Sequence, residues 1–179
     1  MKLLRKEKRY CPRCTDNHVV KIVSQTKRAV IKGVEFNYEA EALYCDTNDS
    51  YAVDAEMAGR NDTAMKDAYR AEIGLLTSED IIEMRKRYGI SQRDLSVVLS
   101  WGLKTITRYE SHQIQDAAHD AILRKLDSDP EWFLELLDKN RDGLSENAYE
   151  KYRKAILKRY ASLADEYMRK AIAAKELAE

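Results

Sequence analysis

Apolar and polar residues alternate in one stretch near the N-terminus and recur at helical spacing after it. Within residues 17–53, every second position from Phe36 to Tyr44 is aromatic or Ala, which is typical of a strand with one buried face. Two apolar runs, 19–23 and 29–31, precede that stretch. This is the strand-like part of the sequence, and it predicts a small antiparallel sheet.

From residue 77 onward the apolar positions have helical spacing. Residues 77–80 combine a capping side chain with two acids, and Gly89 marks a stop, so a helix is predicted between them. Pro130 suits the first turn of a later helix, where its missing N–H costs nothing. The other predicted helices cover 91–99, 103–111, 116–126 and 130–137.

A long amphipathic helix is predicted over 145–174. Its apolar stripe recurs every three or four positions, at Tyr149, Tyr152, Ile156, Tyr160, Leu163, Tyr167 and Ala171. A stripe of that length, about 33 Å, has to be buried against its own core, a second copy or a partner. The tyrosines favour an association element. The alternative is a helix folded back on the apolar side chains of 132–137.

Together these elements predict a mainly α fold with a small N-terminal antiparallel β domain. We expect a zinc-ribbon-like domain over 1–58 and a linker over 59–76, where Gly59 begins a polar stretch. A helix-turn-helix domain should follow over 77–140, and a C-terminal amphipathic helix over 141–179.

Composition supports a soluble, helix-rich chain, with 44% apolar and 35% charged residues, 6 Gly and 2 Pro. There is no apolar run of 18 residues, which argues against a membrane span. The basic N-terminus leads into further charged residues and not into an apolar segment, so it does not resemble a secretory signal. We therefore expect a cytoplasmic protein without a membrane partner.

The formal net charge of zero hides a segregation of charge. Lys and Arg outnumber Asp and Glu by seven over residues 1–35 and by four over 84–110, whereas 36–83 and 111–147 are acidic. A phosphate-binding surface needs local positive charge and not a basic average. Neutrality is thus compatible with nucleic-acid binding.

The three cysteines suggest metal chemistry. Cys11 and Cys14 form a Cys-x-x-Cys pair, which is half of a zinc ribbon, and Cys45 follows at the end of a predicted strand. A full ribbon would have its fourth cysteine at Asn48, a poor zinc ligand. The nearby alternatives for a fourth ligand are His18, Asp46 and Asp49.

Two other interpretations of these cysteines stay open. The sheet could hold without metal as a degenerate ribbon, or Cys11 and Cys14 could be a redox pair. The redox interpretation is the weaker one, because the sequence around the pair has no thioredoxin-like βαβ pattern. If the ribbon interpretation is correct, Cys11, Cys14 and Cys45 should converge at one point.

The sequence from Ile90 to Glu110 predicts a helix-turn-helix. Its apolar positions would lock two short helices across a tight turn, and they are Leu95, Val98, Leu99, Leu103, Ile106 and Tyr109. The second helix would then expose side chains that fit the major groove, while the start of the first suits phosphate contacts. The candidate DNA-binding residues are Ser91, Gln92, Arg93, Lys104, Thr105, Thr107 and Arg108. The alternative is a small helical bundle whose exposed Lys and Arg side chains are only solvated.

The Gln of the first helix, the Leu three residues later and the Ile-Thr-Arg-Tyr-Glu ending resemble the Xre and Cro type of helix-turn-helix. With the N-terminal Cys-x-x-Cys, residues 9–137 resemble the MqsA (YgiT-type) antitoxin family. That resemblance implies a ribbon that binds zinc and a ribonuclease toxin, and a second domain that dimerises and represses the operon. It also places the family's two base-reading positions on Lys104 and Arg108.

The chain departs from the family's pattern at four places. It lacks the fourth cysteine, and the segment beyond Asn140 is an addition. Lys104 stands where the family usually has Asn, which implies a different operator sequence. Ser100 stands where a Gly is usual in the turn, with Gly102 two residues on, which predicts a differently shaped turn. These departures fit a relative from a phage or mobile element.

The leading functional hypothesis is therefore a dimeric autorepressor that binds double-stranded operator DNA and neutralises a toxin encoded beside it. The alternative is a stand-alone regulator without a toxin, whose ribbon senses metal or caps the fold. An enzyme is not expected, because His18, His112 and His119 belong to no recognisable catalytic arrangement. His112 and His119 are expected at the surface around a loop.

Overall fold

The computed structural model describes the backbone of residues 1–176 and the side chains of 1–170. It divides into two compact units, Met1–Thr77 and Ser78–Glu179. The division lies next to the predicted start of the helical domain at residue 77. The side chain of Ala171 and residues 177–179, which belong to the predicted C-terminal helical segment, lie outside what the structure describes.

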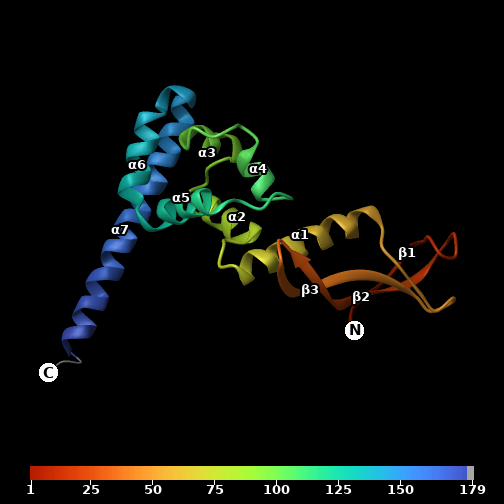
Figure 1. Cartoon of the computed structure of the whole chain (residues 1–179). Helices are drawn as coiled ribbons and strands as arrows, with labels where there is room; N and C mark the ends of the chain where they lie inside the picture. The colour runs from red at the N-terminus through yellow and green to blue at the C-terminus, as the bar shows by residue number, and fades with distance from the viewer. Residues whose placement is uncertain (177–179) are drawn as a thin grey trace. The chain divides into compact units, whose positions relative to one another are not determined.

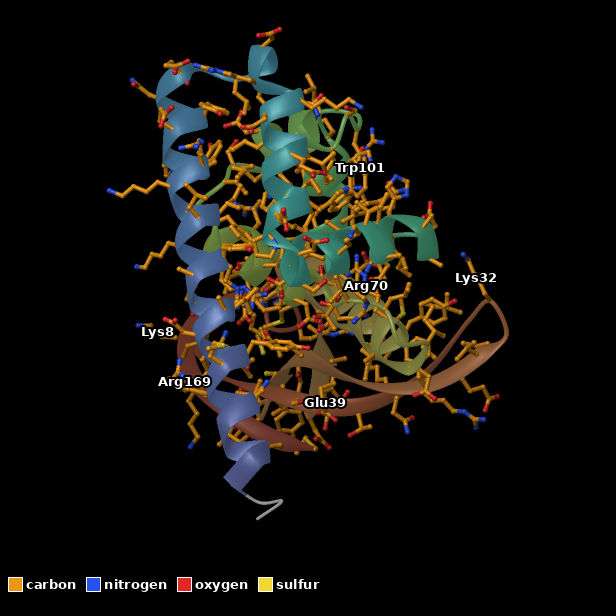
Figure 2. The ribbon with its side chains drawn as sticks, turned by 90° about the vertical axis from the view of Figure 1, so that its left-hand side faces the viewer. Lys8, Lys32, Glu39, Arg70, Trp101 and Arg169 are labelled. Carbon is orange, nitrogen blue, oxygen red and sulfur yellow. The ribbon has the colours of Figure 1, made fainter. Side chains whose placement is uncertain are left out.

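The first unit is built on a four-stranded antiparallel sheet in chain order (Figure 1), as the sequence predicts in outline. Its strands are β1 (Lys2–Cys11), β2 (Asp16–Ile31), β3 (Val34–Cys45) and β4 (Ser50–Ala52). β2 and β3 form a hairpin with Lys32 and Gly33 at its tip, which Figure 2 marks at Lys32. Both residues have positive φ angles, 50° and 82°, as tight hairpin turns require.

The strand β1 is absent from the sequence-based prediction, which began the sheet at residue 17. β1 is an edge strand whose only buried residue is Cys11, so no apolar alternation marks it. Most of its residues are charged. Charged edge strands are common because they discourage pairing with other chains.

The predicted linker over 59–76 is wrong, because α1 (Ala55–Glu72) fills most of it and packs on β3. Met57 is fully buried beside the cysteines, and the ring of Tyr69 lies 5.8 Å from that of Phe36. Asn61 accepts from the backbone N–H of Glu41 at 2.7 Å and donates to its carbonyl at 2.8 Å. The side-chain amide of Asn61 thus hydrogen-bonds to the backbone of Glu41 as a neighbouring strand would. The strand β4 does not reach this position of β3.

The second unit consists of helices. They are α2 (Ser78–Arg87), α3 (Gln92–Val98), α4 (Thr105–Tyr109), α5 (Ala117–Ser128), α6 (Pro130–Lys139), the 3-10 turn η1 (Arg141–Gly143) and α7 (Glu146–Glu176). These bounds agree with the predicted helices to within a few residues. In the described part of the chain, no helix has an apolar stretch that could cross a bilayer.

Apolar side chains from α2 to α7 form the core of this unit. The Tyr88 ring stands edge-on to Phe133 with centroids 4.8 Å apart, and its hydroxyl donates to the carbonyl of Leu126. The buried members are Ile81, Met84, Tyr88, Ile90, Leu95, Val98, Ile106, Tyr109, Leu123, Leu126, Phe133, Leu137, Tyr149, Tyr152 and Ile156.

The tyrosine stripe of α7 divides into two halves. In the first half Tyr149, Tyr152 and Ile156 are buried, and the helix packs on α6, so here the folded-back alternative is correct. In the second half Tyr160 is 51% exposed and Tyr167 is 81% exposed. This distal half extends past the other helices of the unit (Figure 1). The C-terminal helix is therefore not a separate segment after residue 140.

Candidate metal centre and nucleic-acid interface

Four side chains from three strands and the loops beside them meet at one end of the sheet. The thiols of Cys11, Cys14 and Cys45 and a ring nitrogen of His18 all lie within 4.8 Å of one another. The sulfurs of Cys14 and Cys45 are 3.3 Å apart, and the sulfur of Cys45 is 3.6 Å from His18 Nε2. Thiolates on a tetrahedral zinc ion lie about 3.8 Å apart. The predicted convergence of the cysteines is confirmed.

Two loops of matching conformation bring the cysteines together. Cys14 follows Cys11 by three residues, and the next residue, Thr15, has a φ angle of 55°. Asn48 follows Cys45 at the same interval, and the next residue, Asp49, has a φ angle of 45°. The second loop thus has the shape of the first, with Asn48 in the place of a fourth cysteine. Its side-chain amide lies 3.6 Å from the Cys14 sulfur.

Backbone N–H groups in these loops stabilise negative charge on sulfur. Burial raises the pKa of the Cys11 and Cys45 thiols, yet donation from backbone N–H groups in the two loops leaves the pKa of both lowered. Hydrogen bonding to Cys45, followed by burial, raises the pKa of Cys14 to about 12. Metal binding would require Cys14 to lose its proton as well, and a divalent cation would offset the charge of the three thiolates.

His18 is the alternative that the structure favours for the fourth ligand. Its Nδ1 lies 3.0 Å from the carbonyl of Val19, which can only accept a hydrogen bond, and its Nε2 faces the sulfur of Cys45. Such a bond orients metal-binding histidines. Asp46 instead pairs with Lys21 at 2.6 Å, and Asp49 accepts from the hydroxyl of Tyr44 at 2.5 Å. A three-cysteine, one-histidine set is a usual structural zinc site.

In the second unit, the helices α3 and α4 are joined by a turn of defined shape. Ser100 has a φ angle of 55°, the left-handed conformation that favours glycine. The backbone N–H of Ser100 donates to Val97, and that of Trp101 donates to Ser96, which is the Schellman pattern at a helix end. Serine thus adopts here the left-handed conformation that usually requires glycine.

A polar network between α2, α3 and α4 locks this helix pair from inside. Arg85 donates twice to Glu110, at 2.5 and 2.9 Å, and Glu110 is 4% exposed. Gln92 donates to the same carboxylate at 2.6 Å and accepts from Thr107 at 3.0 Å. Both ends of the Gln92 amide therefore bond within the protein, which positions Gln92 between α3 and α4, and its second amide N–H is not used in these two bonds.

Three cations of the helix pair point outward. Arg93, Lys104 and Arg108 are exposed, and no acidic group in the described part of the chain pairs with any of them. Lys104 and Arg108 are four residues apart, which places them on one side of α4.

The remaining candidates lie as follows. Ser91 is exposed and caps α3 by accepting from the N–H of Asp94. Thr105 and Thr107 are half-buried. Leu103, predicted to lock the two helices, is instead 54% exposed. The next residue in the chain is the exposed Lys104, so Leu103 offers an apolar surface next to one of the three cations. Sequence pattern alone assigned it to the core because it is apolar at helical spacing.

An aromatic cluster lies behind the turn. Trp101, labelled in Figure 2, has its ring 4.4 Å from His119 and 6.3 Å from Tyr109. His119 lies on α5, is half-buried and contacts Asp116 at 2.8 Å, so the prediction of a surface loop residue is wrong for it. His112 is exposed, as predicted.

Comparisons with known proteins add no identification. Neither the protein-family models nor the curated proteins contain a match to this chain. The resemblance to an antitoxin family therefore depends on the sequence motifs themselves.

Proposed function

We propose that the chain is a DNA-binding repressor of the antitoxin type, and that α3 and α4 are an Xre/Cro-type helix-turn-helix. One observation carries the proposal: Gln92, Thr107 and Glu110 are bound inward, whereas Lys104 and Arg108 project outward unpaired. Unpaired cations on one side of a short helix suit the edges of guanine in the major groove.

Each exposed residue then has a distinct role on double-stranded DNA. Lys104 and Arg108 address bases, and Leu103 offers an apolar contact for a thymine methyl group. Arg93 and the start of α3 at Ser91 contact phosphates, which fix the register without reading sequence. Thr105 supports these contacts from the start of α4.

In the first unit we propose a structural zinc ion held by Cys11, Cys14, His18 and Cys45. The four donors fit a closed tetrahedral site, and the loops supply backbone N–H groups to the sulfurs. Bound zinc would stabilise the end of the sheet where β1 and β3 finish. A reduced thiol site of this kind fits a cytoplasmic protein.

The proposed partners are a toxin from the same operon and a second copy of the chain. The toxin follows from the family resemblance. For self-association the distal half of α7 offers an exposed apolar face that includes Leu157, Tyr160, Tyr167 and Met168. Exposed patches of this kind are typical of interfaces.

Binding to the DNA upstream of its own gene tests the DNA-reading proposal. Arg108→Ala should remove a base contact worth about 1–3 kcal/mol, which is roughly a 5- to 150-fold loss of affinity at fixed salt. Lys139→Ala removes one exposed cation from α6 and is the matched control. Equal affinities of the wild type and Arg108→Ala would show that α4 is not the reading helix.

Co-expression with the product of the adjacent gene tests the antitoxin role. We expect the two proteins to copurify and the chain to relieve growth inhibition by its neighbour. If operator binding is intact but no neighbour binds or inhibits growth, the chain is a stand-alone regulator. Because the two assays are independent, either half of the proposal can fail alone.

A further inference from the structure

The segment between α6 and α7 holds the C-terminal end of α3. The side-chain amide of Asn140 donates to the carbonyl of Val98 at 3.0 Å, and the hydroxyl of Ser100 donates to its oxygen at 3.2 Å. The last carbonyls of a helix lack partners within the helix. Asn140 thus satisfies one of them and ties down the left-handed residue of the turn.

The helix α7 that follows this segment holds the N-terminal end of α3. The buried Tyr152 of α7 donates its hydroxyl to Asp94 at 2.7 Å and also hydrogen-bonds with Ser91. Burial, followed by the bond to Asp94, raises the pKa of Tyr152, so the phenol remains protonated and able to donate. Asp94 is thereby held toward α7.

The middle of α3 also packs against the segment between α6 and α7. A Cβ atom placed on Gly143 would lie 2.5 Å from Cγ1 of Val97, closer than real Cβ contacts allow. The 3-10 turn η1 therefore lies directly against α3, and a larger residue at position 143 would have to displace Val97.

From these three contacts we propose that Asn140 and Tyr152 are positioning residues that hold α3 and the following turn in the orientation needed for DNA recognition. The inference rests on the proposed DNA-binding function and extends it, because residues 140–152 lie outside the helix-turn-helix. The added C-terminal segment is then part of the DNA-reading unit.

A charge argument explains why Tyr152 matters for DNA. Asp94 lies in the first turn of α3, beside Ser91 and Arg93, the proposed phosphate contacts. A carboxylate free to turn toward a phosphate would repel it. The hydroxyl of Tyr152 engages that carboxylate and leaves Arg93 as the exposed charge.

Two tyrosines of α7 give a matched test. Tyr152→Phe removes only the hydroxyl that reaches α3, whereas Tyr149→Phe removes an equivalent hydroxyl that donates to Asp138 of α6 at 2.7 Å. Both tyrosines are buried. The full chain is used, with operator affinity measured by fluorescence anisotropy and stability by thermal unfolding.

We expect both variants to lose similar stability, and only Tyr152→Phe to lose about three- to tenfold in operator affinity. Asn140→Ala should weaken binding to a similar degree. An equal loss of affinity in the two tyrosine variants, or none in either, would overturn the proposal, because the contact would then be only structural.

Amide hydrogen exchange separates this proposal from the function on which it rests. Tyr152→Phe should speed exchange in residues 91–100 more than Tyr149→Phe does. If the wild-type chain binds no DNA, the proposed function fails, and exchange still decides whether residues 140–152 hold α3. Unchanged exchange in residues 91–100 would reject the positioning role itself.

Discussion

The metal centre and the helix pair both contain clustered polar groups, but they satisfy them in opposite ways. At the end of the sheet, three thiols and a ring nitrogen of His18 lie within 4.8 Å of one another, and we propose that a cation from outside the protein binds them. Between α2 and α4, Glu110 pairs with the cation of Arg85 and accepts a hydrogen bond from Gln92, so its partners come from the protein itself.

The difference shows what each region needs from a partner. The sheet unit buries a small cluster around the cysteines: Cys11, Val20, Ile22, Leu43, Cys45 and Met57. Two of its six members are themselves candidate ligands. A cluster of that size at the end of the sheet would gain stability from a structural ion. The helical unit has its own larger apolar core, and we propose that its outward cations bind DNA.

The largest effect is expected from removing a metal ligand. Structural zinc contributes about 10–16 kcal/mol in small zinc domains, so Cys45→Ser should abolish zinc binding and the cooperative unfolding of the sheet unit. The helical unit should keep its own transition. Zinc content and two-domain thermal unfolding measure both effects.

A second variant sharpens this prediction. His18→Cys keeps a zinc ligand at the fourth position and should retain zinc. His18→Ala removes a ligand outright. Losing a residue that only hydrogen-bonds to a ligand lowers zinc affinity by roughly 10–100-fold, so His18→Ala should lower it further. If Cys45→Ser and His18→Ala lose zinc but keep the stability of the sheet unit, the sheet holds without metal.

An intermediate loss of stability is expected from breaking the polar network of Arg85, Gln92 and Glu110. Glu110→Ala leaves the half-buried Arg85 without its carboxylate, and breaking a buried pair costs about 3–5 kcal/mol. Urea unfolding should therefore show a large loss of stability. Glu135→Ala removes an exposed carboxylate of α6 and should change stability by less than about 0.5 kcal/mol. If Glu110→Ala changed stability only slightly, the helix pair would not depend on its internal network, and the contrast with the cysteine cluster would not hold.

Sequence pattern predicted the helices of the second unit well, because each begins or ends at a strong local signal. Ser91, Asp116 and Asp129 all cap helices through their side chains. The cysteine cluster was also predicted, since a Cys-x-x-Cys pair and a later cysteine have few other uses. The choice among His18, Asp46 and Asp49 depends on strand register, which spacing does not specify.

The features that sequence missed depend on contacts between distant segments. α1 was taken for a linker because its polar residues gave no apolar stripe, yet Asn61 bonds to the edge of β3. Leu103 is apolar but exposed, and Gln92 is polar but bound inward. Tyr152 belonged to a predicted association stripe, whereas its hydroxyl reaches α3.

We expect the smallest effect on stability from substitutions in the distal half of α7. They test whether the exposed side chains of this half bind a second copy of the chain. Tyr160 and Tyr167 are 51% and 81% exposed, so the double variant Tyr160→Ser, Tyr167→Ser removes little buried surface. Unfolding free energy should change by no more than about 0.5 kcal/mol for each site, while sedimentation should show fewer dimers.

The control is Tyr149→Phe, which keeps the distal face. A large loss of stability with unchanged mass would show that the chain itself covers this face, because burial within the chain is what makes such a substitution costly.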